Sequence, residues 1–172
     1  MLAKNIEAAL NKQIRIEAES SQTYLSMACW AEVNGLEGIS TFMHAQSNEE
    51  RQHMLKLIKY VNDRGGHSKI SELNAPKTEF ENFKNMFELL YQHELFVSES
   101  INELVRITFE EKDYSTHNFL QWYVAEQIEE ESQAKTILDK INLIGDDKGG
   151  LYLFDRDIQL IAANNSKANT QI

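Results

Sequence analysis

The sequence predicts an all-α protein, a four-helix bundle with one long crossover connection and a short fifth helix near its C-terminus. Two observations support this fold class. The 172 residues include only 7 glycines and 1 proline, so few residues are present that interrupt helices. Apolar side chains also recur at alternating steps of three and four residues through four long stretches, which is the period of one face of an α-helix.

The few helix-breaking residues divide the chain into its expected elements. Glycines at positions 35, 38, 65 and 66 close the first two stretches, and no glycine occurs from residue 67 to residue 144. The break expected within that span is at residues 112–115, where Asp113 or Ser115 could cap a new helix. Within one domain of residues 1–172, the expected helices span about 5–33, 37–64, 83–111, 114–143 and 151–163, and a polar tail follows at 164–172.

The connector between the second and third helices is long enough to span the bundle. A helix of about 28 residues is roughly 42 Å long. About 15 extended residues cover a similar distance at roughly 3.3 Å each. The connector at residues 65–82 therefore lets the second and third helices run parallel, whereas short turns make the first pair and the last pair antiparallel.

Charge and composition argue against several classes of function. The formal net charge is −10, which is unfavourable for binding nucleic-acid phosphates. No apolar run approaches the roughly 20 residues of a membrane span, and residues 1–10 lack the layout of a secretory signal. A single cysteine, Cys29, excludes an intrachain disulfide, so we expect a cytoplasmic protein in which Cys29 is a buried, inert thiol.

Each of the four core stripes contains a glutamate near its midpoint. These residues are Glu17, Glu50, Glu94 and Glu130. The midpoint of a helix lies at the same height whichever way the helix runs, so the four carboxyl groups should meet in one layer of the core. Buried carboxylates are very costly unless a positive charge compensates them. The four groups are therefore either protonated or gathered around a cation.

One histidine extends this acidic layer. His53 lies one turn from Glu50 on the same helix face, and an imidazole is a common metal ligand. An oxygen-rich site with one nitrogen suits iron or manganese better than a metal that prefers thiolates. Two cations bridged by a shared carboxylate would neutralise most of the charge. The combination of four aligned glutamates with His53 therefore predicts a metal centre inside the bundle.

Several segments resemble bacterial non-haem ferritins over nearly the whole chain. They are Glu17 with Ser20, Ser21 and Tyr24; Asn48-Glu49-Glu50-Arg51-Gln52-His53; Tyr91-Gln92-His93-Glu94; Asn118-Phe119-Leu120-Gln121-Trp122-Tyr123-Val124-Ala125-Glu126-Gln127; Glu129-Glu130-Glu131; and Gly150-Leu151-Tyr152. A glutamate from two helices with Glu-x-x-His on the others, and one long crossover, are features of ferritin-like carboxylate bundles. The resemblance implies that Glu17, Glu50 and His53 hold one iron. It also implies that Glu50, Glu94 and Glu130 hold a second iron, with Glu50 as the bridge.

The same resemblance assigns residues around this di-iron site. Gln127 would form a hydrogen bond at the site, and Tyr24 would lie behind the ligands. His93 points roughly 100° away from the neighbouring Glu94, and we expect it to be structural. A third, looser iron site would use Glu49, Glu126, Glu129 and Glu130.

Two departures limit the cofactors that the resemblance implies. The fourth helix has Gln127-x-x-Glu130 where bacterioferritins have a second Glu-x-x-His, and Arg51 stands where their haem-binding methionine is found. We therefore expect iron but no haem. The chain also has no Cys-x-x-Cys pair, so it lacks the rubredoxin-like iron module of a rubrerythrin.

The resemblance implies a ferroxidase that stores iron. Fe(II) would be oxidised to Fe(III) by dioxygen or hydrogen peroxide and stored as a ferric mineral in a hollow shell of 24 identical subunits. The sequence leaves two alternatives. One is an iron-binding bundle without catalysis, and the other is a DNA-protecting mini-ferritin. The second is disfavoured because Lys4 is the only lysine in the first ten residues, so a basic N-terminal arm is absent.

Overall fold

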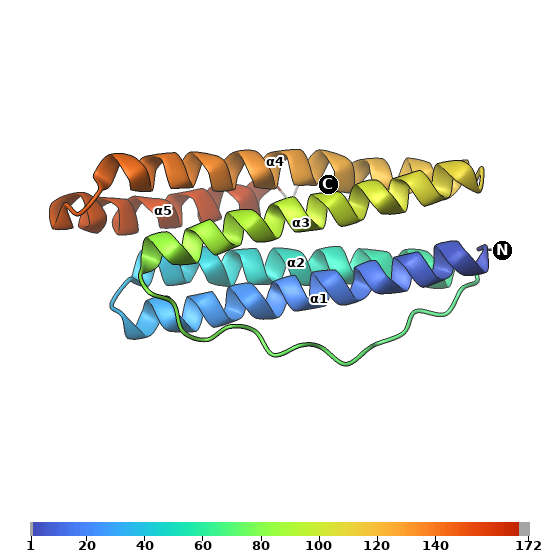
Figure 1. Cartoon of the computed structure of the whole chain (residues 1–172), viewed down its shortest axis with the longest axis horizontal. Helices are drawn as coiled ribbons and strands as arrows, with labels where there is room; N and C mark the ends of the chain where they lie inside the picture. The colour runs from blue at the N-terminus through green and yellow to red at the C-terminus, as the bar shows by residue number, and fades with distance from the viewer. Residues whose placement is uncertain (1, 169–172) are drawn as a thin grey trace.

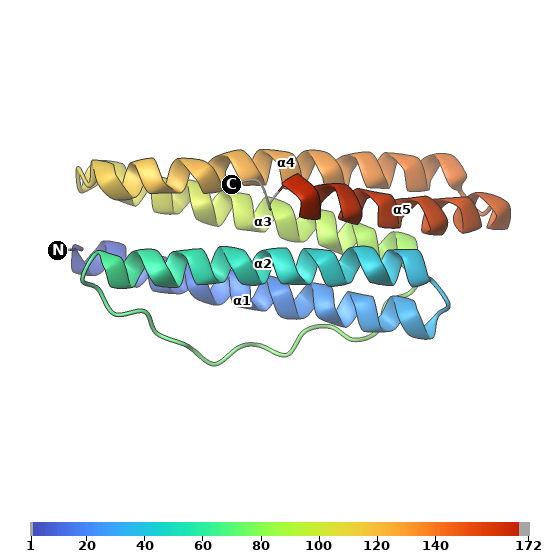
Figure 2. The ribbon, with the colours of Figure 1, turned by 180° about the vertical axis from the view of Figure 1, so that it is seen from behind.

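Four long helices lie side by side in the described part of the chain, and a fifth folds back against them (Figures 1 and 2). The structure, a computed structural model, describes the backbone of residues 2–168 and the side chains of residues 2–161. The helices are α1 Lys4–Val33, α2 Glu37–Asp63, α3 Phe83–Glu110, α4 Tyr114–Ile144 and α5 Lys148–Ala168. The predicted all-α bundle is confirmed, and each of the first four helices lies within one residue of its expected bounds.

The boundaries of the long helices lie at residues whose side chain caps a helix or whose backbone permits a turn. Gly35 adopts φ +73°, a left-handed conformation that glycine tolerates without strain, and the chain turns there between α1 and α2. Asn82 caps α3, because its side chain accepts a hydrogen bond from the backbone N–H of Asn85 at 2.8 Å. Of the two expected caps for α4, the structure uses Asp113, which accepts from the backbone N–H of Thr116 at 3.1 Å.

The crossover between α2 and α3 runs along the outside of α1 for most of the length of the bundle (Figure 1). It is fixed to α1 by side-chain hydrogen bonds at separate heights. The Asn11 amide donates to the carbonyl oxygen of His67 at 3.0 Å, and the Ser26 hydroxyl donates to that of Lys77 at 2.8 Å. As a result α2 and α3 run in the same direction, as the connector length predicts.

The apolar core is divided into two clusters at different heights in the bundle. Toward the turn between α1 and α2, the first cluster includes Tyr24, Ala31, Ile39, Phe42, Phe87, Ile141 and Phe154. Toward the other end, the second includes Leu2, Leu10, Leu57, Val61, Leu104 and Leu120. On each of α1 to α4 a buried glutamate lies at mid-height between the two clusters, so a polar layer separates them.

The fifth helix is longer than expected at both ends. It spans 148–168 rather than 151–163, so residues 164–168, expected in a polar tail, are helical, and residues 169–172 lie outside the described residues. The early start follows from Asp147, whose carboxylate accepts from the backbone N–H of Gly150 at 2.7 Å and so caps the first turn. No glycine or proline follows Gly150 to stop the helix.

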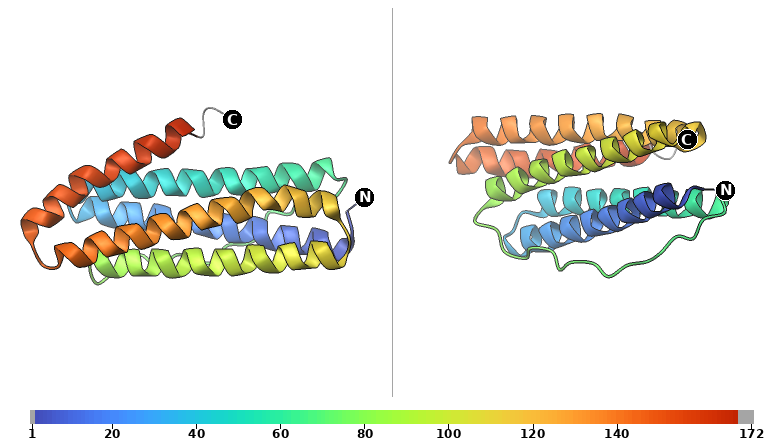
Figure 3. Two further views of the ribbon diagram at one scale, coloured as in Figure 1. Left: turned by 90° about the horizontal axis from the view of Figure 1, so that it is seen from above. Right: turned by 45° about the vertical axis from the view of Figure 1, so that its right-hand side comes forward.

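A carboxylate joins α5 to the beginning of α2, which α5 crosses obliquely (Figure 3). Asp155 accepts hydrogen bonds from the backbone N–H groups of Gly38 at 3.2 Å and Ile39 at 2.9 Å. These N–H groups have no partner within their own helix, and a negative charge is favourable at a helix N-terminus. Phe154 and Ile158 are buried beside Asp155, so α5 completes one end of the core.

The expectation for Cys29 is wrong, because this cysteine is exposed. Its neighbour Ala28 lies fully buried on the core stripe. One further residue turns the side chain by about 100° around the helix, which is enough to bring it to the surface. Among residues 2–168, no helix has a run of apolar residues that would let it cross a membrane.

The contact between α5 and α2 predicts that alanine substitutions at Gly38 and at Gly149 affect the stability of the protein differently. In Gly38→Ala the new Cβ atom would lie 1.6 Å from the carbonyl oxygen of Asp155, so α5 must move. We expect a loss of about 1–3 kcal/mol in unfolding free energy, measured by urea denaturation. The control is Gly149→Ala, where the nearest atom of Asp147 would be 3.5 Å away and no loss is expected. Equal midpoints for the two variants would contradict this account of the contact.

Candidate metal centre

The four mid-helix glutamates converge in the buried layer between the two apolar clusters. Glu17, Glu50 and Glu94 are each 1% exposed, and Glu130 is 7% exposed. Each comes from a different helix of the bundle, in the order α1, α2, α3 and α4. The sequence-based expectation of four buried carboxyl groups at one level therefore matches their placement.

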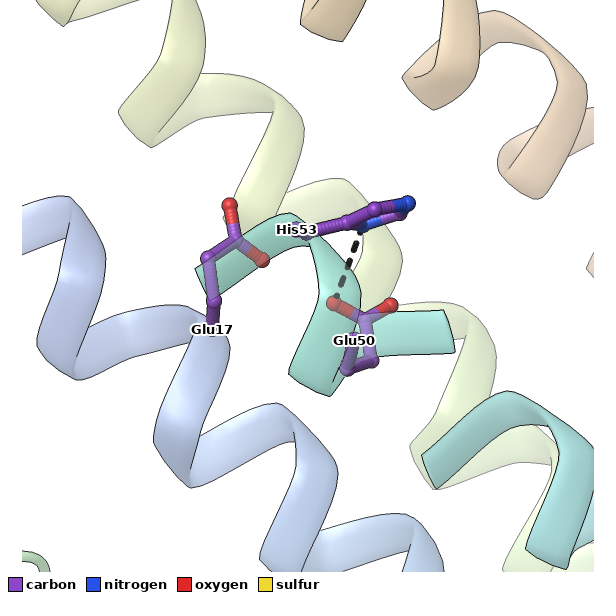
Figure 4. A group of neighbouring side chains, drawn as sticks. All are labelled: Glu17, Glu50 and His53. Carbon is purple, nitrogen blue, oxygen red and sulfur yellow. Dashed lines mark ion pairs between the residues drawn. The ribbon is translucent and has the colours of Figure 1, made fainter. Parts of the chain in front are cut away.

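Glu17, Glu50 and His53 form a fully buried group of potential metal ligands. One ligand atom of each lies within 4.8 Å of the others, and the three side chains point toward one another from α1 and α2 (Figure 4). The Nδ1 atom of His53 lies 3.4 Å from Oε2 of Glu50. This spacing leaves room for a cation that all three residues could contact at once.

Glu94 is held from two sides by hydrogen-bond donors. The Tyr24 hydroxyl donates to its Oε1 atom, and the Gln127 amide donates to its Oε2 atom at 3.2 Å. Both expected neighbours of the site are therefore in contact with a candidate ligand. His93 instead packs edge-on against the Tyr24 ring and forms a 2.7 Å hydrogen bond with Ser20, in keeping with a structural role.

Two further glutamines, which the sequence analysis did not assign to the site, contact the remaining carboxylates. The Gln13 amide donates to Oε1 of Glu17 at 2.9 Å, and the Gln46 amide donates to Oε2 of Glu130 at 3.3 Å. The sequence pattern could have indicated both residues, because each glutamine lies on the core-facing stripe of its helix one turn before a glutamate. A glutamine at such a position cannot contribute to apolar packing, so its polar side chain indicates a contact with the neighbouring carboxylates.

Both glutamines are themselves anchored, which fixes the direction of their amide groups. The Ser100 hydroxyl donates to the carbonyl oxygen of Gln13 at 2.7 Å. The side-chain amide of Gln133 donates to the carbonyl oxygen of the Gln46 side chain at 3.1 Å. Because each carbonyl oxygen is occupied by a donor, the amide N–H groups face the carboxylate. One oxygen of Glu17 is thereby engaged while its Oε2 atom has no hydrogen-bond partner.

The electrostatics of the layer favour either protons or a cation. Burial raises the pKa of Glu17, Glu50 and Glu130 well above the usual range, and the proximity of the other carboxylates raises it further. Burial also raises the pKa of Glu94, to about 6. Among the ion pairs of the described residues, none joins these four carboxylates to a lysine or arginine. Apart from His53, whose charge lowers the pKa of Glu17 and Glu94, the described residues supply no positive charge to the layer.

A second group of potential ligands lies outside the buried layer. Glu49, His53 and Glu126 each offer a ligand atom within 4.8 Å of the others. They line a surface cavity of about 510 Å³, so His53 separates the cavity from the buried carboxylates. Of the residues expected in a third iron site, Glu49 and Glu126 are together here. Glu129 is exposed and outside this group, although its charge contributes to the raised pKa of Glu126.

Comparisons with known proteins relate the whole chain to one family. The sequence matches the family described as Ferritin-like domain over residues 7–144. A probable bacterial non-heme ferritin-like protein of Haemophilus influenzae is 47% identical over 158 residues, which cover 92% of this chain and 96% of the relative. A bacterial non-heme ferritin of Campylobacter jejuni is 44% identical over 167 residues, 97% of this chain and 100% of the relative.

Solved structures give the same result for the fold. An open pore ferritin from the archaeon Archaeoglobus fulgidus matches with a TM-score of 0.92 and 42% sequence identity. The match covers 93% of this chain and 99% of the archaeal one. The resemblance expected from the sequence segments is therefore confirmed.

The raised carboxyl pKa values predict that the metal-free protein loses stability as the pH rises. The folded protein keeps a proton on Glu94 up to about pH 6, whereas the unfolded chain releases it near the usual 4.5, so this contribution is complete below pH 4.5 and is lost above pH 6. For Glu94 the loss is on the order of 2 kcal/mol.

Urea denaturation with a chelator present, at several pH values between 4.5 and 7.5, measures this effect. Glu94→Gln should lose less stability over that interval than the wild type, because its amide does not titrate. Glu99→Gln, at an exposed position on α3, is the matched control and should follow the wild type. A wild-type protein that gains stability as the pH rises would contradict the assignment of buried, uncompensated carboxyls.

Because Ser100 anchors the side-chain amide of Gln13, we expect substitution of Ser100 to weaken metal binding. Ser100→Ala removes the hydroxyl that holds the amide in place, so Gln13 can turn its carbonyl oxygen toward Glu17. We expect Co(II), used as a spectroscopic probe, to bind about three- to tenfold more weakly, in line with the loss of one hydrogen bond. Ser100→Thr keeps the hydroxyl and should bind like the wild type. Similar Co(II) affinities for the alanine and threonine variants would show that the anchor has no effect.

Proposed function

The chain belongs to the ferritin family, and on that premise we propose that it is an iron-storage subunit that oxidises Fe(II) at its buried carboxylate layer. The observation that supports this most directly is the convergence of Glu17, Glu50 and His53, with ligand atoms within 4.8 Å of one another, beside Glu94 and Glu130. Hard, anionic oxygen ligands with one imidazole suit iron. A substrate cation is also what the layer requires to offset its buried charge.

The ligands divide naturally between two iron ions. Glu17 and His53 would bind one ion, Glu94 and Glu130 the other, and Glu50 would bridge them. Burial raises the pKa of Glu50, and the charge of Glu94 raises it further, so these carboxyls interact. Protons held by these raised-pKa carboxyls would leave as Fe(II) binds, so binding should strengthen with rising pH.

The oxidation itself balances without any further reductant. Two Fe(II) ions each lose one electron, and dioxygen takes up both electrons and two protons to give hydrogen peroxide. If hydrogen peroxide is the oxidant, it takes up two electrons and two protons to give two water molecules. Carboxylate ligands favour this direction because they stabilise Fe(III) more than Fe(II). Tyr24 and Gln127 hold Glu94 in place while the charge of the metals increases.

Iron would then leave this layer for storage. Glu49 and Glu126, with His53 beside them, offer a neighbouring cation site, and Glu129 extends the acidic surface around it. We infer that Fe(III) is mineralised inside a hollow, cytoplasmic homo-oligomer, with the 24 subunits typical of the family. Haem has no part in this proposal. The support for this part of the proposal is membership of the family together with the acidic groups on one side of the bundle.

The two alternatives differ from the proposal in where and how iron is bound. A DNA-protecting mini-ferritin binds iron between subunits, whereas Glu17, Glu50 and His53 already meet inside the bundle of a single chain here. The −10 net charge also disfavours contact with DNA. A non-catalytic iron carrier would have the same ligands, so only a measurement of oxidation separates it from a ferroxidase.

We expect the double substitution Glu50→Ala with His53→Ala to abolish rapid Fe(II) oxidation. It removes the bridging carboxylate and the imidazole, so the initial rate of oxygen consumption should fall at least about a hundredfold. Size-exclusion chromatography checks that the assembly is retained. The control, Glu99→Ala, removes an exposed carboxylate on α3 and should oxidise iron like the wild type. Wild-type kinetics in the double variant would refute the assignment, and a wild type no faster than buffer would favour the non-catalytic carrier.

A further inference from the structure

A lysine ammonium group lies in the same cavity as the outer ligand group. The Nζ atom of Lys56 is 3.1 Å from the centroid of the Trp122 ring. Lys56 and Trp122 line the cavity together with Glu49, His53 and Glu126. The spacing explains this, because positions 49, 53 and 56 share one face of α2, and positions 122 and 126 share one face of α4. The cavity therefore places a fixed positive charge beside three potential metal ligands.

We propose that Lys56 is a built-in competitor for cations at the outer group formed by Glu49, His53 and Glu126. Its ammonium supplies part of the positive charge that the two carboxylates attract. A metal ion that binds between the carboxylates must either displace the ammonium or bind despite its repulsion. This inference rests on the proposed function, because it concerns how iron is held outside the buried layer. Its consequence is that the outer group binds cations weakly and releases them readily.

The contacts of Lys56 support this competition. A cation over the face of a tryptophan is attracted by the ring, which holds the ammonium of Lys56 at the wall of the cavity. Burial lowers the pKa of Lys56, whereas the negative charge of Glu126 raises it. Lys56 thus interacts electrostatically with one of the three ligands, and the ammonium would repel a divalent or trivalent ion bound at that ligand.

Another lysine in the same cavity lacks this arrangement. Lys59 also lines the cavity, but its ammonium is 2.5 Å from the carboxylate of Asp63 and its side chain is 75% exposed. Removing either lysine changes the charge of the cavity wall by one unit. Only Lys56 stacks on Trp122 and interacts with Glu126. Lys59 is therefore a matched control for a general effect of charge.

The test measures Tb(III) binding to the assembled, metal-free protein by luminescence excited through tryptophan. Tb(III) is a hard cation that binds carboxylates, and Trp122 lies beside the outer group. The signal that Glu126→Gln removes is assigned to this group. Lys56→Gln should raise the Tb(III) affinity of that signal about tenfold. Lys59→Gln should leave it within about twofold, because an exposed, paired charge is screened by solvent. Lys56→Arg keeps the cation over the ring and should bind like the wild type.

Three results would overturn the inference. Equal gains in Lys56→Gln and Lys59→Gln would show that only the general charge of the cavity matters. An unchanged affinity in Lys56→Gln would show that the ammonium does not compete. If no variant gives a signal that depends on Glu126, the outer group is not a cation site. None of these results bears on oxidation at the buried layer, which the double substitution of Glu50 and His53 tests separately.

Discussion

Four carboxyl groups buried at one height, with no ion pair to a lysine or arginine among the described residues, are the constraint on which the rest of the structure depends. Their pKa values are raised, first by burial and then by one another, so charging them without a counter-ion is costly. The groups around them, such as Tyr24 and Gln127, are neutral hydrogen-bond donors, which orient carboxylates but do not neutralise them. A bound metal ion resolves this conflict, and that is the physical reason for regarding the layer as a site.

The fold meets this constraint by placing the layer at the middle of every helix. Apolar clusters above and below contribute the burial that stabilises the bundle, so the polar layer does not have to. Gln13 and Gln46 then bind one oxygen of Glu17 and Glu130 respectively, each held by a second donor. The result is a set of carboxylates whose directions are fixed before any metal arrives, which reduces the reorganisation that binding requires.

The bundle and the four buried glutamates could be predicted because they depend on periodicity within single helices and on sparse helix breakers. Contacts between side chains of different helices could not be predicted in this way. Ser100 meets Gln13 across 87 residues of sequence, and Lys56 meets Trp122 from another helix. Cys29 was misplaced because it adjoins the core stripe, and one residue decides whether a side chain faces inward. The start of α5 was predicted three residues too late because Asp147 caps the helix through the backbone N–H of Gly150.

The measurement that tests the central claim most directly is an anomalous-scattering map, recorded at the iron edge, from a crystal soaked in Fe(II) without oxygen. We predict two peaks within the buried layer. One should lie among Glu17, Glu50 and His53, and the other among Glu50, Glu94 and Glu130. A map with iron only on the surface, and none between these glutamates, would contradict the account.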